Sequence, residues 1–161
     1  MAFFSANTAA FVSSASANAF LTALMIIGIA GKRARLVHLH ASCAGAAAHD
    51  EPMRVRVGKT NQAGPGTPGA TPTPKPPDSA AGVASVLTCG AAYSAEPTTY
   101  DTITTTGCYW EGGWNGRGWV TQNWLPEWAP TINGVQSLGI LIAPSTANAR
   151  AANVSVVWEE F

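Results

Sequence analysis

Two of the three histidines are spaced so that they could bind a metal ion. His38 and His40 lie two residues apart, which places both imidazoles on one face of a β-strand. The third ligand would have to be His49 or an acid such as Asp50, and nothing in the sequence selects one. The alternative is a polar face open to solvent or to a partner, where a histidine contact would respond to pH near neutrality. We favour the polar face and predict no bound metal.

The acidic and nucleophilic residues do not form a recognisable catalytic pattern. A glycosidase would need two carboxylates flanking its substrate, but acids beside aromatic residues are too common to indicate one. The chain has no phosphate-binding loop, no G-x-S-x-G motif and no cysteine with a catalytic histidine context. We therefore predict that the protein is not an enzyme and has no catalytic residue and no cofactor. The glutamates considered are Glu111, Glu127, Glu159 and Glu160.

The three cysteines, Cys43, Cys89 and Cys108, are odd in number and far apart, with no C-x-x-C spacing. A disulfide framework or a zinc site is disfavoured by this spacing. Reduced thiols in a protein assembled inside a cell fit best, although one pair could still form a bridge.

Tryptophan is concentrated in one stretch of the chain. Five of the six tryptophans lie between Trp110 and Trp128, interrupted by glycines. Large rigid rings are enriched at protein interfaces, and they also stack on sugars, but several could simply fill the core. We predict that Trp119 and Trp158 lie in or near the core. The remaining interface candidates in this region are Trp114, Trp124 and Trp128.

Charge is scarce and unevenly distributed. Only 11% of the residues are charged, against about 25% in a typical globular domain. The formal net charge is zero, so the total indicates neither a nucleic-acid nor a membrane partner. Residues 1–60 carry six cations and two acids, and the remainder carries three cations and seven acids. Either copies stack head to tail, or the fold interleaves the halves and cancels the asymmetry; we favour cancellation.

The first 30 residues contain a polar segment followed by an apolar one. Residues 1–18 are rich in Ala, Ser and Asn, and we predict an extended N-terminal arm that docks on a neighbouring subunit through Phe3, Phe4 and Phe11. A frayed end is the alternative. Residues 19–30 are apolar, but the basic residues follow them, which disfavours a secretory signal. The run is also too short to span a bilayer, so it predicts a buried strand.

Several segments alternate with the period of two that is typical of β-strands. In residues 32–42, Val37 and Leu39 fall on one face and His38 and His40 on the other, after a turn at Gly31. Residues 53–59 place three apolar side chains on one face and cations on the other. The further strand candidates are residues 19–30, 83–89, 100–106, 135–143 and 154–160.

Two long segments interrupt these strands. Residues 62–80 contain six prolines, which exclude a central strand or a helix interior and predict an extended Pro/Gly-rich loop, densest at 64–77. Residues 110–128 form a Trp/Gly-rich region that we expect to be a loop. Many short strands and no amphipathic helix predict an all-β, antiparallel β-sandwich, a single jelly roll, in residues 19–161.

The order of several short motifs resembles that of small structural proteins of tailed-phage and prophage virions. The motifs are A-R-L-V-H-L-H-A-S, D-E-P-M-R-V-R-V-G-K-T, G-x-G-T-P, Y-S-A-E-P-T and a terminal V-S-V-V-W-E-E, covering roughly residues 30–161. The Pro-rich loop and the Trp/Gly-rich region depart from that pattern.

This resemblance implies a jelly roll that forms a homotrimer and acts as a capsid decoration (cement) protein. Its partners would be the major capsid protein and further copies of itself, with no nucleic acid and no membrane. It would be made in the host cytoplasm and reside on the capsid surface of the virion. The alternative is a fibre or tail-tip module that binds a host glycan or receptor, with Trp114, Trp124 or Trp128 stacking on the sugar.

Overall fold

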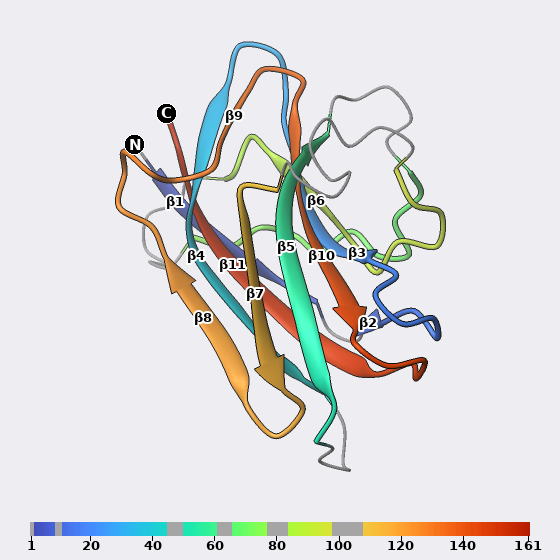
Figure 1. Ribbon diagram of the computed structural model, residues 1–161. Helices are drawn as coiled ribbons and strands as arrows, with labels where there is room; N and C mark the ends of the chain where they lie inside the picture. Colours follow the sequence, from blue (N-terminus) through green and yellow to red (C-terminus); the bar gives the residue numbers. More distant parts are fainter. Residues whose placement is uncertain (1, 9–10, 45–49, 61–65, 77–83, 98–107) are drawn as a thin grey trace.

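The computed structural model describes residues 2–8, 11–44, 50–60, 66–76, 84–97 and 108–161, and within them it contains strands and no helix. No segment of this part could therefore cross a membrane as a helix. Two antiparallel sheets face each other as a sandwich (Figure 1). The strands are β1 (Ala2–Asn7), β2 (Phe11–Val12), β3 (Leu21–Ile27), β4 (Arg33–Cys43), β5 (Pro52–Thr60), β6 (Thr88–Ala91), β7 (Trp110–Asn115), β8 (Trp119–Asn123), β9 (Thr131–Asn133), β10 (Ser137–Pro144) and β11 (Ala151–Glu160).

The strand order is that of a single jelly roll. One sheet runs β1-β11-β4-β8, with β2 added beside β11 and β9 beside β4, and the other runs β6-β3-β10-β5-β7. Without the short strands β2, β6 and β9, the remaining strands follow the orders 1-8-3-6 and 2-7-4-5 along the chain. Two sheets wound in this way are the double Greek key of a jelly roll. The predicted fold class is confirmed.

The core lies between the sheets and is built by the alternation that the sequence predicts. Met53, Val55 and Val57 of β5 are fully buried, whereas the arginines between them face outward. On β4 the alternation is broken at Val37: β11 pairs with Leu36 and then with His38, so Val37 is the extra residue of a β-bulge. As a result Leu36 and Leu39 both point into the core. The prediction that Val37 and Leu39 share one face of a regular strand is therefore wrong.

The N-terminal segment belongs to the sandwich, which differs from the predicted arm. β1 pairs along its whole length with β11, from Ala2 opposite Glu160 to Asn7 opposite Ser155. β2 pairs with the other end of β11. Phe4 and Phe11 lie in the hydrophobic core. Alanine, serine and asparagine are weak strand formers, so the composition of residues 1–18 does not predict strands. Here the stability of the two strands comes from pairing with β11 and from the burial of these two rings.

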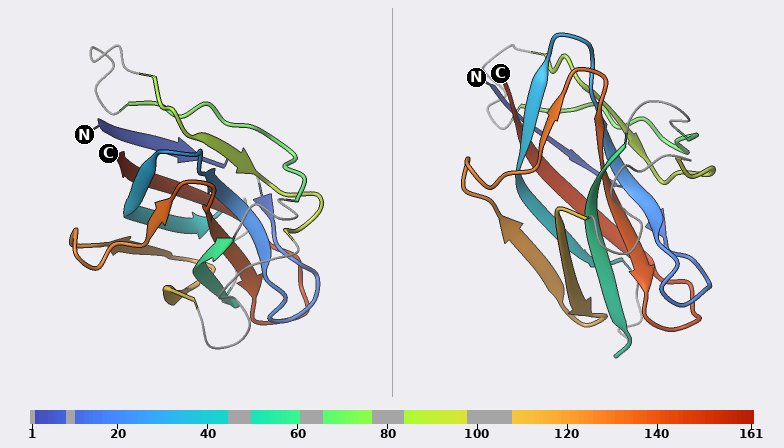
Figure 2. Two further views of the ribbon diagram at one scale, coloured as in Figure 1. Left: turned by 90° about the horizontal axis from the view of Figure 1, so that it is seen from above. Right: turned by 45° about the horizontal axis from the view of Figure 1, so that its top comes forward.

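The described part of the Pro-rich loop, residues 66–76, is extended as predicted but is bound to its own chain. The backbones of Lys75 and Ser5 exchange hydrogen bonds of 2.8 and 2.9 Å, and those of Ala70 and Ala91 exchange bonds of 3.0 and 2.8 Å. The segment therefore runs beside β1 of one sheet and β6 of the other (Figure 2). It covers parts of two sheet edges that would otherwise present unpaired backbone groups.

The Trp/Gly-rich region is not a loop but two strands, β7 and β8, one in each sheet, joined by a turn at residues 116–118. Glycine is compatible with a strand at position 112 because the Trp110 ring occupies the space of a side chain there. A Cβ on Gly112 would lie 2.3 Å from the Trp110 ring. Of the strand expected at 83–89, residues 84–87 lie before β6 and residue 83 lies outside the described residues. The strand expected at 100–106 also lies outside the described residues.

Candidate interaction surfaces

Three of the six predicted interface side chains are core residues of the single chain. Phe4 is 1% exposed and its ring lies 6.1 Å from that of Trp158, centroid to centroid. Phe11 is also buried, and Trp114 is 6% exposed. Phe4, Phe11 and Trp114 alternate with more exposed neighbours on their strands. The sandwich of the single chain therefore buries these three rings, which we had assigned to a partner interface. Their predicted interface role is wrong.

The other three have different surroundings. Trp124 is half-buried and packs edge-on against Trp110, with ring centroids 5.9 Å apart. Phe3 faces outward from β1, and Trp128 is 77% exposed on the connection between β8 and β9. An interface role of Phe3, Trp124 and Trp128 stays a prediction.

Trp119 was expected in or near the core and is instead 68% exposed, whereas Trp158 is fully buried as predicted. On β8 it is Val120 that packs against the core, so Trp119 and Thr121 point outward. The segment W-V-T-Q-N has too little contrast between its two faces for the sequence to reveal this orientation.

One end of the sandwich, which we call the hairpin end, carries exposed apolar side chains. It comprises the turn at residues 28–32, the turn at 133–136 and Phe161. The turns are held together by the amide of Gly28 donating to Gln136 (3.1 Å) and that of Gly134 donating to Lys32 (2.9 Å). The predicted turn residue Gly31 has a φ of +78°, which suits glycine. Exposed side chains at this end are Ile29, Val135 and Phe161.

The two halves of the sequence are interleaved in the fold, as we favoured, and cancellation of their opposite charges stays a prediction. The ion pairs among the described residues each join a residue before position 61 to one after it. They are Arg35–Glu159, Arg54–Glu111, Arg56–Glu111, Arg117–Asp50 and Arg150–Glu51.

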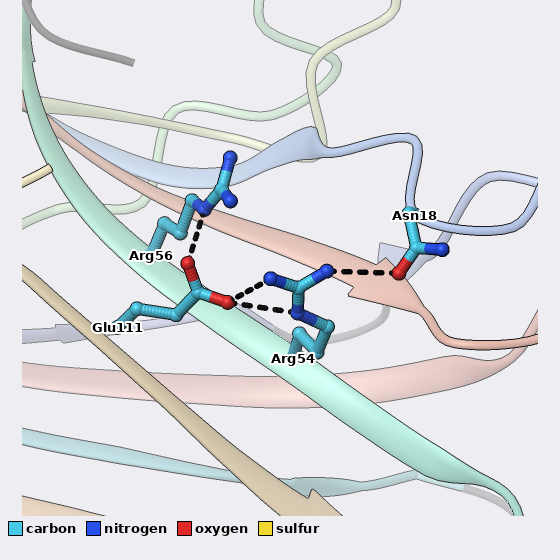
Figure 3. Close-up of polar contacts among 4 residues, drawn as sticks. All are labelled: Asn18, Arg54, Arg56 and Glu111. Atoms are coloured by element: carbon cyan, nitrogen blue, oxygen red, sulfur yellow. Dashed lines mark hydrogen bonds and ion pairs between the residues drawn. The ribbon is translucent and has the colours of Figure 1, made fainter. Parts of the chain in front are cut away.

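The most connected of these pairs lies on the outer face of the five-stranded sheet (Figure 3). Glu111 of β7 accepts from Nε of Arg54 (2.8 Å) and from Nε of Arg56 (2.7 Å), both on β5. Arg54 also donates to Asn18 (2.9 Å), and the Arg56 guanidinium lies 4.1 Å from the centre of the Phe20 ring. Burial opposes ionisation of Glu111, but the hydrogen bonds and charges of both arginines outweigh it and lower its pKa.

The outer face of the six-stranded sheet is different, because it is polar and almost without charge. Three rows of side chains cross it from strand to strand, and we call them together the neutral face. The first row is Asn153, Ser42 and Trp119; the second is Asn7, Ser155, His40 and Thr121; the third is Ser5, Val157, His38 and Asn123. The nearest charged row holds Arg35 and Glu159, which pair with each other at 2.5 Å.

Two shallow pockets adjoin on the neutral face and share Asn7 and Ser155. One extends over β4 to His40 and Ser42. The other extends over the edge of β1 to Thr73 and Lys75 of the Pro-rich segment. Together they form a groove between that segment and the centre of the sheet.

The predicted histidine pair lies on this face and contacts β8. Nδ1 of His38 is 2.6 Å from Oδ1 of Asn123, and Nδ1 of His40 is 3.1 Å from Oγ1 of Thr121. Among the described residues no three histidine, cysteine or acidic side chains are grouped to hold a metal ion. Asp50 pairs with Arg117, and His49 lies outside the described residues.

Three of the four glutamates considered for catalysis are engaged in other contacts, and the fourth, Glu127, is exposed. Glu111 binds two arginines and Glu159 binds Arg35. Glu160 accepts from the indole of Trp158 (3.0 Å) and from the amide of Val86 (3.1 Å). Cys43, Cys89 and Cys108 all have free thiols.

No family model matches the sequence, and no curated protein is similar to it. The solved structures found by shape include an empty head of Turnip Yellow Mosaic Virus, with 14% identity over 98% of this chain and 80% of that one and a TM-score of 0.23. They also include a decameric BFDV capsid protein (8% identity, 99% and 96%, TM-score 0.22). VP17, a capsid protein of bacteriophage P23-77, gives 9% identity over 98% and 97% and a TM-score of 0.15. These neighbours come from viral capsids, but TM-scores this low carry no argument for this chain.

Proposed function

We propose that this protein is a non-enzymatic structural protein of a virion. The single jelly roll supports the proposal, since this architecture recurs in the shells of viruses, although it also occurs in lectins and cupins. The observation that carries it is the hairpin end, where Ile29, Val135 and Phe161 are exposed together on a chain in which five of the six arginines form ion pairs. Apolar side chains gathered at one end of a domain are typical of a surface that a partner covers.

Within that role, the best supported position is that of a decoration protein on the outside of a phage head. The motif order that resembles phage virion proteins supports it, and closed trimers are a common way for one surface patch to be satisfied by copies of itself. The partners would be the major capsid protein and two further copies. The protein would act mechanically, by adding contacts between capsid subunits that resist the internal pressure of DNA.

Copy number in purified particles tests this function. Quantitative mass spectrometry against the major capsid protein should give hundreds of copies per particle, in a simple ratio. A few copies would favour the alternative, a fibre or tail-tip module that binds a glycan or receptor, and absence from particles would reject the virion assignment.

The contribution of the hairpin end can be tested separately. We expect the double substitution Ile29→Ser and Val135→Ser to reduce retention on particles at least tenfold, because the loss of two central apolar contacts weakens an interface by more than 1 kcal/mol. Retention is measured by co-sedimentation of added protein with particles that lack it. Val12→Ser is the matched control, since Val12 is equally exposed but lies on β2 beside the other end of β11. Equal retention of all variants would remove the hairpin end from the interface.

A further inference from the structure

The neutral face has a chemistry that a shell contact does not require. Nine of its eleven side chains carry polar hydrogen-bonding groups, two of them imidazoles, and Trp119 and Val157 are the other two. Neither lysine, arginine nor an acid occurs in the three rows. Lys75 lines only the pocket that extends over the edge of β1, and the pocket beside His40 is lined by no lysine, arginine or acid. A charged ligand in the pocket beside His40 would lose hydration without gaining an opposite charge from such a residue, so this pocket favours a neutral ligand with many hydroxyl groups.

The side chains that would make the hydrogen bonds are held in place by their neighbours. His38 is fixed by Asn123 and His40 by Thr121, so both rings are oriented before a ligand arrives. Asn153 and Ser155 line the pocket beside His40 and present an amide and a hydroxyl. Groups that are already ordered cost less conformational entropy when they bind.

The exposed ring of Trp119 ends the first row. It lies opposite Ser42, which in turn lies opposite Asn153, so an apolar ring borders the polar pocket. The apolar body of an indole can cover the C–H face of a sugar while adjacent polar groups bind the hydroxyls. The four strands β1, β11, β4 and β8 span about 14 Å from centre to centre, the reach of a short saccharide chain.

We propose that the neutral face is a binding site for a neutral oligosaccharide. Trp119 stacks on one sugar ring, and His40, Asn153 and Ser155 bind hydroxyl groups of the adjoining sugars. Because the pockets are shallow and open, the site takes an internal stretch of a chain rather than enclosing a single sugar. Nothing in this proposal depends on whether the protein sits on a head, a fibre or a tail.

The test is binding of the full chain to a printed array of neutral, sialylated and sulfated glycans, followed by calorimetric titration of the best neutral hexasaccharide. We expect neutral glycans to bind. Trp119→Ala should lower the affinity about tenfold or more, as truncation of a central aromatic contact does. Asn153→Ala should lower it as well, and it keeps the proposal testable if Trp119→Ala affects solubility.

Leu125→Ala is the matched control, since Leu125 is 64% exposed, close to the 68% of Trp119, but lies on the β8–β9 connection outside the three rows. Its affinity should stay within twofold of the parent protein. The proposal is overturned if no neutral glycan binds, if only acidic glycans bind, or if Leu125→Ala loses as much affinity as Trp119→Ala. It is also overturned if Trp119→Ala changes the sedimentation coefficient of the free protein, because the face would then join two copies. Copy number in particles is independent of all these outcomes.

Discussion

At the scale of single residues, Cys89 shows how burial controls reactivity. Its thiol lies in the core, and burial together with the negative charge of Glu160 raises its pKa to about 12. The reactive thiolate is therefore nearly absent at neutral pH. The other two cysteines, Cys43 and Cys108, are half-buried.

We expect Cys89 not to react with Ellman's reagent in the folded protein and to react after unfolding in urea. The time course of thiol release at pH 8 measures this directly. Cys89→Ala is the control, and it should leave the reaction of the native protein unchanged. Loss of a fast-reacting thiol in that variant would mean that the core around Cys89 opens readily.

At the same scale, two neighbouring phenylalanines test whether the N-terminal segment is a strand of the sheet or a loose arm. Phe4 lies in the core and Phe3, one position earlier on β1, points to solvent. We expect Phe4→Ala to lower the free energy of unfolding by about 3–5 kcal/mol, the usual cost of removing a buried phenylalanine. Phe3→Ala should change it by less than about 0.5 kcal/mol, as is typical of surface positions.

Urea unfolding followed by tryptophan fluorescence compares the two variants. If both substitutions had the same small effect, β1 would not be an integral strand of the sheet in solution.

At the scale of elements, Glu111 links β7 to β5 through an ion-pair cluster. The pKa of Glu111 is lower in the folded protein than in the unfolded chain, so the unfolded state takes up its proton first as the pH falls. The stabilisation is complete above the ordinary glutamate pKa and is lost as the pH falls through the lowered value.

We expect Glu111→Gln to destabilise the protein by about 1 kcal/mol at pH 7, in line with partly exposed ion pairs. The difference from the parent protein should shrink towards zero in acid, below the lowered pKa. Thermal unfolding between pH 7 and pH 2 measures it. Glu127→Gln is a suitable control, since Glu127 is exposed and takes part in none of the described ion pairs. A constant difference at every pH would assign the effect to packing instead of charge.

At the scale of the whole molecule, the sequence predicts what local patterns determine. The apolar alternation of residues 53–57 places them correctly, and the histidines lie on a polar face as favoured. The neutral face could not be predicted, because its rows join positions such as Asn7 and Ser155 that are far apart in sequence. Strand register between such segments depends on the complete sandwich and leaves no local signal.

The same limit explains the residues that were misplaced. Phe4, Phe11 and Trp114 are buried by strands that come from elsewhere in the chain, and Trp119 is exposed because Val120 fills the inward position. An aromatic residue in the sequence indicates a side chain that can bury a large area. It does not indicate whether residues of its own chain or of a partner bury it.

The position of β11 between β1 and β4 has a consequence for the protein as it leaves the ribosome. β11 follows all the other described strands in the chain. β1 and β4 therefore have unpaired edges until synthesis has passed position 160. Exposed strand edges of this kind invite pairing between nascent chains. Chains arrested with β11 still inside the exit tunnel should be cleaved readily by protease, and chains long enough to bring β11 out of the tunnel should be resistant. We therefore expect chaperones to be needed most while several nascent chains on one polysome still lack β11.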